Sequence, residues 1–279
     1  MNRENESAIT LSRDVDEQQV RTMTRRSLLL GAVGIGAAAY AVRWIGTQET
    51  NNGVPWFLRR CLQMNEKLAR SYFRGYHQAP EFDESLISER TNGDIGLSGD
   101  IDETTHVVRV VGLHDMTGAI KADDTTEPAI EINMARIKAL PRRTIVTELK
   151  CIEGWSIVVK WTGARLIDLA EQLGPATISG NKPDVLNSAH DILPYVALET
   201  PDGTYYVGLD TQSALHPQTL LCYEMNNKPL ADEHGAPVRL VIPVKYGVKH
   251  IKRIGVIRFT ASRPKDYWAE QGYDWYAGL

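Results

Sequence analysis

The sequence of 279 residues contains few cysteines and no closely spaced pair of them. Its three cysteines, Cys61, Cys151 and Cys222, are too few and too widely spaced for the disulfide framework of a small secreted domain. No Cys-x-x-Cys pair is present, which argues against a structural zinc site of the common type. Any chemistry carried by cysteine here must therefore depend on a single thiol and its surroundings.

The sequence also lacks an excess of positive charge and any internal repeat. Its formal net charge of -4 at pH 7 argues against a nucleic-acid-binding protein, so no nucleic-acid partner is expected. Hydrophobic residues make up 43% of the chain, which provides for a sizeable core and excludes global disorder. The length suits one large domain or two small ones.

An N-terminal export leader is predicted over residues 1–46. Two adjacent arginines, Arg25 and Arg26, precede an apolar run rich in glycine and alanine, which is typical of a twin-arginine signal. Residues 39–41 offer a small-x-small cleavage site. The run of about 15 residues is shorter than the ~20 that a membrane-spanning helix needs, although Trp44 follows it where an interfacial anchor would lie. We expect export to the periplasm or cell envelope, with a membrane anchor formed by an uncleaved leader as the alternative.

The rest of the sequence predicts a mixed α+β fold that is rich in β-structure. Residues 47–104 contain one amphipathic helix, from 55 to 72, and a long loop over the surface of the domain. Residues 105–279 form the main domain, with many short strands and few helices. The expected strands are 106–113, 129–132, 142–150, 195–200, 204–209, 220–226, 239–244 and 254–260, and the expected helices are 134–140 and 166–173.

Cys151 follows the predicted strand 142–150 and precedes Gly154 and Trp155. A single cysteine among apolar residues is most often a small core residue. On a loop beside Lys150, however, the positive charge would lower the pKa of the thiol, and a thiolate is a good ligand for a soft metal. From the residues alone, both interpretations of Cys151 stay open.

A basic, glycine-bearing run extends from Arg239 to Arg253. It contains five lysines and arginines and no acidic residue. Such a run can bind a phosphate, because arginine grips phosphate through two donors and Gly247 allows the backbone to approach a ligand closely. A strand at a sheet edge, protected by its lysines, explains the same charges equally well.

These motifs resemble those of the sulfite oxidase-fold molybdopterin-dependent oxidoreductase family. The turn at 151–156 is similar to the segment whose cysteine binds molybdenum, and the runs 234–243 and 246–252 resemble the pterin-binding region. Over residues 105–279, the sequence most resembles the catalytic subunits of bacterial periplasmic protein-methionine-sulfoxide reductases. The resemblance implies a molybdopterin cofactor, with Cys151 as the catalytic metal ligand.

The resemblance also implies a set of cofactor-binding residues. The loop before the first strand supplies Asn92, whose alternative role is an ordinary Asn-Gly turn. The strand 195–200 supplies Thr200, which could equally be a plain strand-end threonine. A Gly-Pro loop supplies His234, a residue that would otherwise be solvated. The implied cofactor-binding set is Cys151, Asn92, Thr200, His234, Arg239, His250, Ile251 and Lys252.

The function that the resemblance implies is oxygen-atom transfer at sulfur. Reduction of an S-oxide such as methionine sulfoxide, as a small molecule or within a protein, is favoured over sulfite oxidation. The residues leave no room for a haem domain or a second dimerisation domain, so we expect a monomer with a separate electron-transfer partner, such as a membrane haem protein. The remaining alternative is a non-catalytic exported binding module that kept the fold and lost the metal.

Overall fold

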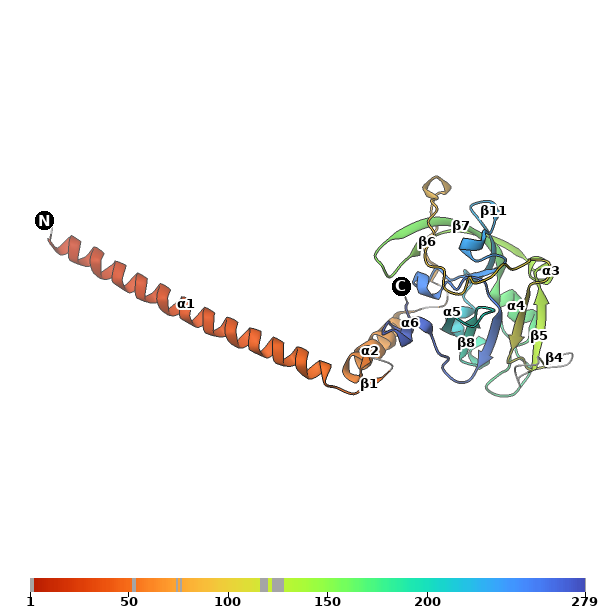
Figure 1. Cartoon of the computed structure of the whole chain (residues 1–279), viewed down its shortest axis with the longest axis horizontal. Helices are drawn as coiled ribbons and strands as arrows, with labels where there is room; N and C mark the ends of the chain where they lie inside the picture. The colour runs from red at the N-terminus through yellow and green to blue at the C-terminus, as the bar shows by residue number, and fades with distance from the viewer. Residues whose placement is uncertain are drawn as a thin grey trace. The chain divides into compact units, whose positions relative to one another are not determined.

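The computed structural model describes residues 3–51, 54–73, 75, 77–115, 120–121 and 128–278. The chain divides into two compact units, Met1–Arg59 and Arg60–Leu279. In the first unit, helix α1 (Arg3–Gly46) is followed by the antiparallel strands β1 (Thr50–Asn51) and β2 (Val54–Pro55) (Figure 1).

Part of helix α1 is long and apolar enough to cross a membrane. This segment is Arg25–Gly46, with 22 residues and a mean hydropathy of 1.7. The sequence predicted an apolar run of only about 15 residues, which underestimated the length of this segment. The helical segment also includes the flanking residues up to Gly46, so it reaches the ~20 residues that a bilayer requires. A signal sequence near the N-terminus has the same length and composition, so the export leader and the membrane anchor both stay predictions.

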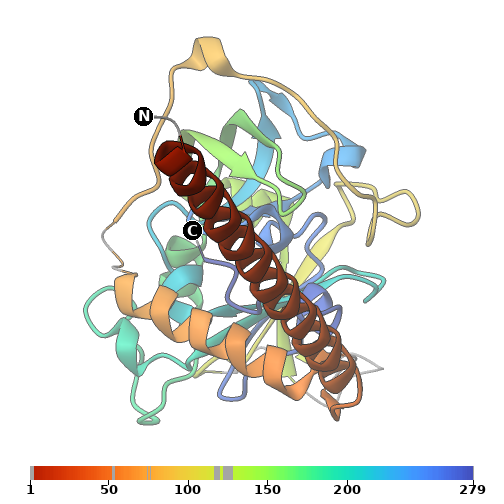
Figure 2. The same cartoon turned by 90° about the vertical axis from the view of Figure 1, so that its left-hand side faces the viewer.

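Helix α2 (Trp56–Tyr72) confirms the predicted amphipathic helix. The side of α2 that packs on the larger unit carries the buried Glu66, whose carboxylate accepts a hydrogen bond from Arg263 at 2.6 Å. Leu68 and Tyr72, on another side of the helix, are exposed. Figure 2 shows α2, in orange, at the surface of the larger unit.

Two β-sheets form the frame of the larger unit. Their strands are β3 (Val107–Val111), β4 (Ile120–Lys121), β5 (Pro128–Asn133), β6 (Arg142–Lys150), β7 (Ser156–Arg165), β8 (Tyr195–Glu199), β9 (Tyr206–Asp210), β10 (Leu220–Met225), β11 (Lys228–Pro229), β12 (Arg239–Val241) and β13 (Val256–Thr260). One sheet has the order β11-β10-β7-β6, with β12 also paired to β10. The other has the order β4-β5-β3-β13-β8-β9, in which only the β3–β13 pair is parallel among the described strands.

Short helices connect the strands and complete a mixed α+β fold that is rich in β-structure, as predicted. The longest of these connecting helices, α4, ends at Gly174, whose left-handed backbone (φ 66°) suits glycine at this position. The helical segments are α3 (Met134–Lys138), α4 (Leu166–Leu173), α5 (Thr211–Ala214) and α6 (Tyr267–Glu270), with single 3-10 turns at Glu84–Leu86, Ala189–Asp191, Asp232–His234 and Gly247–Lys249.

Several predicted strands are shorter in the structure, two of them for clear local reasons. The strand predicted from 239 to 244 ends at Val241, because the chain turns around Pro243 and the N–H of Lys245 donates to the carbonyl of Ile242 at 2.9 Å. The strand predicted from 204 begins at Tyr206. The N–H of Thr204 instead donates to the Asp202 carboxylate at 3.0 Å, which keeps this residue in the turn.

The main hydrophobic core joins the two sheets and α4, and a second cluster lies on the other face of strands β6, β7 and β10. Alternate residues of β10 divide between the two: Leu221 belongs to the main core, and Cys222 packs with Trp161 in the second cluster. Cys222 is fully buried, as predicted, and burial raises the pKa of its thiol to about 12. This cysteine is therefore a core residue.

In the aromatic C-terminal segment, Trp275 and Tyr276 are buried, whereas Tyr273 is exposed. Trp275 donates from Nε1 to the carbonyl of Pro264 at 3.0 Å, and the Lys245 ammonium lies 2.9 Å from the centre of the Tyr276 ring. These contacts place the segment against strand β9 and the turn that follows β12. There, the Tyr276 ring stabilises the buried Lys245 ammonium through a cation–π interaction.

A buried histidine, His216, makes the stability of the domain sensitive to acid. Its Nδ1 accepts from the N–H of Gln218 at 3.2 Å, and its Nε2 lies 3.0 Å from the carbonyl of His77, so the neutral ring satisfies both partners. Burial lowers the pKa of His216 and, in the same way, that of His106. The folded domain therefore binds protons at these rings less tightly than the unfolded chain does.

We expect the free energy of unfolding to decrease as the pH falls below about 6.5, the usual pKa of histidine. Acid favours the unfolded chain because it takes up more protons, and stability returns as the pH rises through the unfolded-state pKa. Urea unfolding at neutral and mildly acidic pH measures the effect. His216→Asn should reduce the difference in the free energy of unfolding between the two pH values, whereas the exposed control His190→Asn should retain it. Equal differences in the two variants would contradict the assignment of this acid sensitivity to His216.

Candidate functional site

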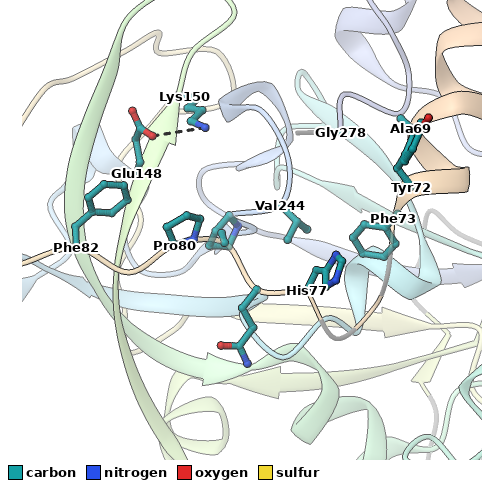
Figure 3. A pocket seen from close by; sticks show the side chains of 13 residues that line it. Ala69, Tyr72, Phe73, His77, Pro80, Phe82, Glu148, Lys150, Val244 and Gly278 are labelled. Atoms are coloured by element: carbon teal, nitrogen blue, oxygen red, sulfur yellow. Dashed lines mark ion pairs between the residues drawn. The ribbon is translucent and has the colours of Figure 1, made fainter.

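Two pockets on the larger unit were considered as the functional site. The larger one, with a volume of about 530 Å³, lies between the end of α2 and strand β6 and is lined mainly by apolar side chains such as Phe73, Pro80 and Phe82 (Figure 3). Its charged residues include the ion pair Glu148–Lys150, at 3.6 Å. No thiol or arginine is among its described lining residues, so it lacks the chemistry that the sequence predicts.

The smaller pocket, with a volume of about 150 Å³, brings the predicted chemistry together. Five residues of the implied cofactor-binding set line it: Asn92, Cys151, Arg239, His250 and Lys252. They come from the loop before β3, the end of β6, strand β12 and the turn that follows it. A thiol and two basic side chains thus meet in one cavity, whose lining residues Asn92 and Lys252 lie 160 residues apart in the sequence.

The β6–β7 turn positions Cys151 at this pocket. The N–H of Cys151 donates to the carbonyl of Trp155 at 2.9 Å, and Gly154 closes the turn with a left-handed backbone (φ 87°). Gly247 lies on the opposite wall, where an added Cβ would come within 3.2 Å of the carbonyl of Lys150. The thiol is half-buried, so a ligand in the pocket can reach it.

The electrostatic environment of the thiol differs from the prediction. Burial raises the pKa of Cys151, and the carboxylate of Glu153, with Oε2 3.7 Å from Sγ, raises it further. Lys150 was expected to lower this pKa, but its ammonium pairs with Glu148 at 3.6 Å. That expectation was wrong, because burial and the Glu153 carboxylate both disfavour the thiolate form.

Arg239 is a buried cation in the wall of the pocket. Its guanidinium donates to the carbonyls of His234 at 2.9 Å and His250 at 3.1 Å and lies 4.9 Å from the centre of the Trp161 ring. Burial lowers its pKa to about 10, and its Nε has no hydrogen-bond partner within the described part of the chain. No carboxylate of the described residues pairs with it, which leaves the charge available for an anion.

Lys252 and His250 extend the same wall. The Lys252 ammonium donates to three backbone carbonyls, those of Asn92, Gly93 and Glu233, and burial lowers its pKa to about 8. Burial and the charge of Arg239 lower the pKa of His250 to about 3, and its Nδ1 has no partner among the atoms described. The wall therefore contains a desolvated ammonium that only neutral carbonyls surround, and two buried nitrogen atoms, Arg239 Nε and His250 Nδ1, that lack a partner among the described residues.

This donor set fits the cofactor that the resemblance implies. A phosphate-bearing pterin needs buried cations and unpaired donors: Arg239 supplies both, through its unpaired Nε, and Lys252 supplies a second buried cation. A soft metal needs a thiolate beside open space, and Cys151 supplies the sulfur at the same pocket.

Three members of the implied set do not line the pocket. The hydroxyl of Thr200 donates to the Asp202 carboxylate at 2.6 Å, and its methyl group packs under Gly96. The side chain of Ile251 is fully buried, and its carbonyl accepts from the N–H of Leu240 at 2.8 Å. Their roles toward a cofactor stay predictions.

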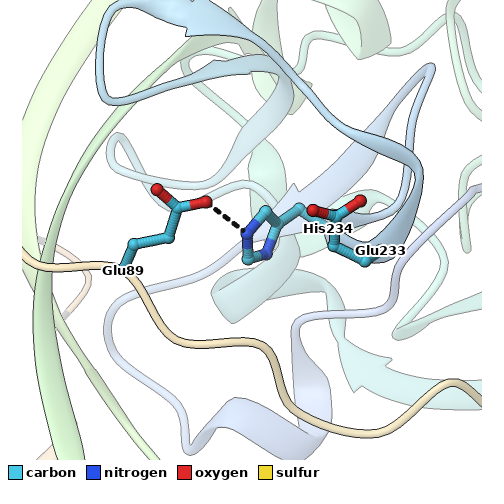
Figure 4. Close-up of side chains that lie close together, drawn as sticks. All are labelled: Glu89, Glu233 and His234. Carbon is cyan, nitrogen blue, oxygen red and sulfur yellow. Dashed lines mark hydrogen bonds and ion pairs between the residues drawn. The ribbon is translucent and has the colours of Figure 1, made fainter.

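His234 is the third of these residues, and it is buried rather than solvated. Its Nε2 lies 3.1 Å from a carboxylate oxygen of Glu89, with Glu233 beside it (Figure 4). One ligand atom from each of the three residues lies within 4.8 Å of the others, but both carboxylates are exposed. The carbonyl of His234 accepts a hydrogen bond from Arg239. His234 therefore helps to position a residue of the pocket lining, although it does not line the pocket itself.

Aromatic side chains that the sequence did not single out form another part of the lining. The rings of Trp268 and Tyr273 meet edge-to-face with centroids 5.3 Å apart, and the hydroxyl of Tyr205 donates to the carbonyl of Val248 at 2.6 Å. Trp268 precedes the aromatic C-terminal segment and Tyr273 belongs to it, and no local signal in the sequence distinguishes these rings from ordinary packing residues. Only their position beside the basic run in space marks them as site residues.

The family of the chain follows from comparisons with known proteins. The family model described as "Oxidoreductase molybdopterin binding domain" matches residues 104–268. The catalytic subunit MsrP of protein-methionine-sulfoxide reductase from Xanthomonas campestris is 32% identical over 161 residues, which cover 58% of this chain and 47% of the relative. The Campylobacter jejuni protein of the same name is 35% identical, over 55% of this chain and 53% of the relative.

Other similarities are more distant or incomplete. The solved structure of the sulfane dehydrogenase SoxCD from Paracoccus pantotrophus is 16% identical, with a TM-score of 0.46, and the match covers 69% of this chain and 50% of that one. The chain spans about half the length of the curated relatives it matches. The family model, however, covers more than half of this chain and includes Cys151, Arg239 and Lys252. The chain therefore belongs to the family of oxidoreductase molybdopterin binding domains.

Proposed function

We propose that this protein is an exported molybdopterin-dependent oxidoreductase that reduces S-oxides such as methionine sulfoxide. The observation that carries the proposal is the pocket in which the Cys151 thiol faces the buried cations Arg239 and Lys252. The names of the most similar relatives favour the reductive direction over sulfite oxidation.

Each residue of the pocket has a role that follows from its chemistry. Cys151 would bind the metal through its sulfur, and Arg239 and Lys252 would hold the phosphate of the pterin. His250, which stays neutral at physiological pH because its pKa is about 3, would donate or accept a hydrogen bond without adding charge. The cofactor, when bound, supplies the oxygen-atom and electron transfer.

The proposed reaction also determines which reactants, electrons and protons must reach the pocket. Reduction of a sulfoxide to a thioether consumes two electrons and two protons and releases one water. A separate electron-transfer protein, for example a membrane haem protein, would supply the electrons to this monomer. The rings of Trp268 and Tyr273 offer the contacts that a thioether sulfur makes with aromatic edges, so they would orient the substrate.

Export supports the same function. Arg25 and Arg26 precede the apolar segment of α1, and the twin-arginine route carries proteins that are already folded around a cofactor. We therefore propose that the protein acts in the periplasm or cell envelope, either after cleavage of the leader or attached to the membrane through it.

Metal content and turnover test the proposal together. Protein matured in the presence of molybdate should contain about one molybdenum per chain, since one thiolate site is available. With an artificial electron donor, it should reduce methionine sulfoxide faster than it oxidises sulfite with an artificial acceptor. The opposite preference would favour a sulfite oxidase, and absence of molybdenum would favour the non-catalytic binding module.

A further inference from the structure

Helix α2 carries an apolar stripe that the domain does not cover. Phe57, Met64, Leu68 and Tyr72 recur at spacings of seven, four and four residues, which places them on one face of a helix. Their exposed fractions are 38%, 58%, 53% and 79%. We call these four residues the exposed stripe. A contiguous exposed apolar face of this kind marks an interaction surface.

The opposite face of α2 explains why the stripe points outward. Glu66 is buried against the domain and accepts from both Arg70, at 3.0 Å, and Arg263, at 2.6 Å. The pair with Arg263, which lies outside the helix, fixes the rotation of α2 about its axis. Because the paired face holds α2 against the domain, the more apolar face remains at the surface.

The position of α2 in the chain identifies what covers the stripe. The candidate membrane span ends at Gly46 and α2 begins at Trp56, so the connecting residues can separate the two by at most about 30 Å. Within the first unit, the rings of Trp44 and Phe57 meet edge-to-face with centroids 6.4 Å apart. The end of the span thus lies beside the beginning of the stripe, with aromatic residues of the type that favours a membrane interface.

The charges that flank the stripe fit the same partner. Arg60 and Lys67 are exposed along one side of it, next to the apolar residues. A helix with an apolar face and a cationic margin is the form that lies in the interfacial plane of a bilayer with anionic headgroups.

We propose that α2 is an interfacial helix, with the exposed stripe of Phe57, Met64, Leu68 and Tyr72 inserted among the lipids of an anionic membrane surface. The larger unit would then be held on the membrane at a fixed rotation. This proposal does not depend on the cofactor or the substrate, and its failure would leave the proposed function untouched.

Photocrosslinking of the full chain in lipid vesicles tests the proposal. Leu68→p-benzoylphenylalanine places a photoreactive group on the stripe, and the matched control Gln63→p-benzoylphenylalanine places it on another exposed face of α2. In vesicles of phosphatidylethanolamine and phosphatidylglycerol, we expect about tenfold more lipid adduct at 68 than at 63. Equal lipid yields at the two positions, or a protein dimer adduct at 68 in place of the lipid adduct, would overturn the proposal.

Discussion

Cys151→Ser is expected to abolish molybdenum-dependent turnover, with a loss of at least about 100-fold, because even residues that only support a metal ligand cost 10- to 100-fold when replaced. Serine has nearly the same shape as cysteine, but its hydroxyl does not become an anionic soft ligand at physiological pH. The side chain is half-buried in a turn held by backbone hydrogen bonds, so the fold should be unaffected. Metal analysis, turnover and thermal unfolding of the same preparation measure the three quantities separately.

The control for this substitution is Cys61→Ser, on helix α2 and outside the pocket lining. It should retain both molybdenum and turnover. Normal turnover in Cys151→Ser would exclude this thiol as the metal ligand. A loss of turnover in both variants would instead point to a general sensitivity to the removal of sulfur.

Asp266→Ala is expected to lower the free energy of unfolding by about 3–5 kcal/mol, which is the usual cost of leaving one partner of a buried ion pair alone. Asp266 accepts from the Lys249 ammonium and from the N–H groups of Gly208, at 3.1 Å, and Ala269, at 3.0 Å. Burial already lowers the pKa of Lys249, so the carboxylate is what keeps this ammonium charged inside the domain. The melting temperature should fall by roughly 10 °C for a domain of this size.

Two further variants separate the ion pair from its surroundings. Lys265→Ala changes the exposed neighbour and should leave stability within about 0.5 kcal/mol of the original protein. Adding Lys249→Met to Asp266→Ala should recover much of the loss, since an uncharged side chain needs no partner. A cost below about 1 kcal/mol for Asp266→Ala alone would show that the ion pair contributes little.

Local patterns in the sequence were sufficient to predict elements that end on local signals. Helix α4 matches its predicted bounds because Gly174 terminates it, and strand β6 matches because Pro141 precedes it and the Cys151 turn follows. Helix α2 was predicted correctly, but the sequence carries no local signal for its rotation about its axis. Its rotation depends on the pairing of Glu66 with Arg263, which lies nearly 200 residues away in the sequence.

The same distinction between local signals and contacts across the fold applies to the candidate site. The resemblance indicated Cys151, Arg239 and Lys252, and the fold brings them to one pocket. The direction of the thiol pKa shift could not be predicted from the adjacent Lys150. It depends on burial and on which way the neighbouring side chains point, and both are properties of the packed structure. Trp268 was missed because its role depends on contact across the fold.

The hydrogen bonds from the Lys252 ammonium to three carbonyls connect cofactor binding to the stability of the folded protein. Two of them, Asn92 and Gly93, belong to a loop 160 and 159 residues away, and all three are neutral. A desolvated ammonium beside Arg239 is therefore a source of internal repulsion until an anion reaches it. An incoming phosphate would relieve that repulsion and tighten the loop at once, so a loaded chain would resist proteases and heat better than an empty one.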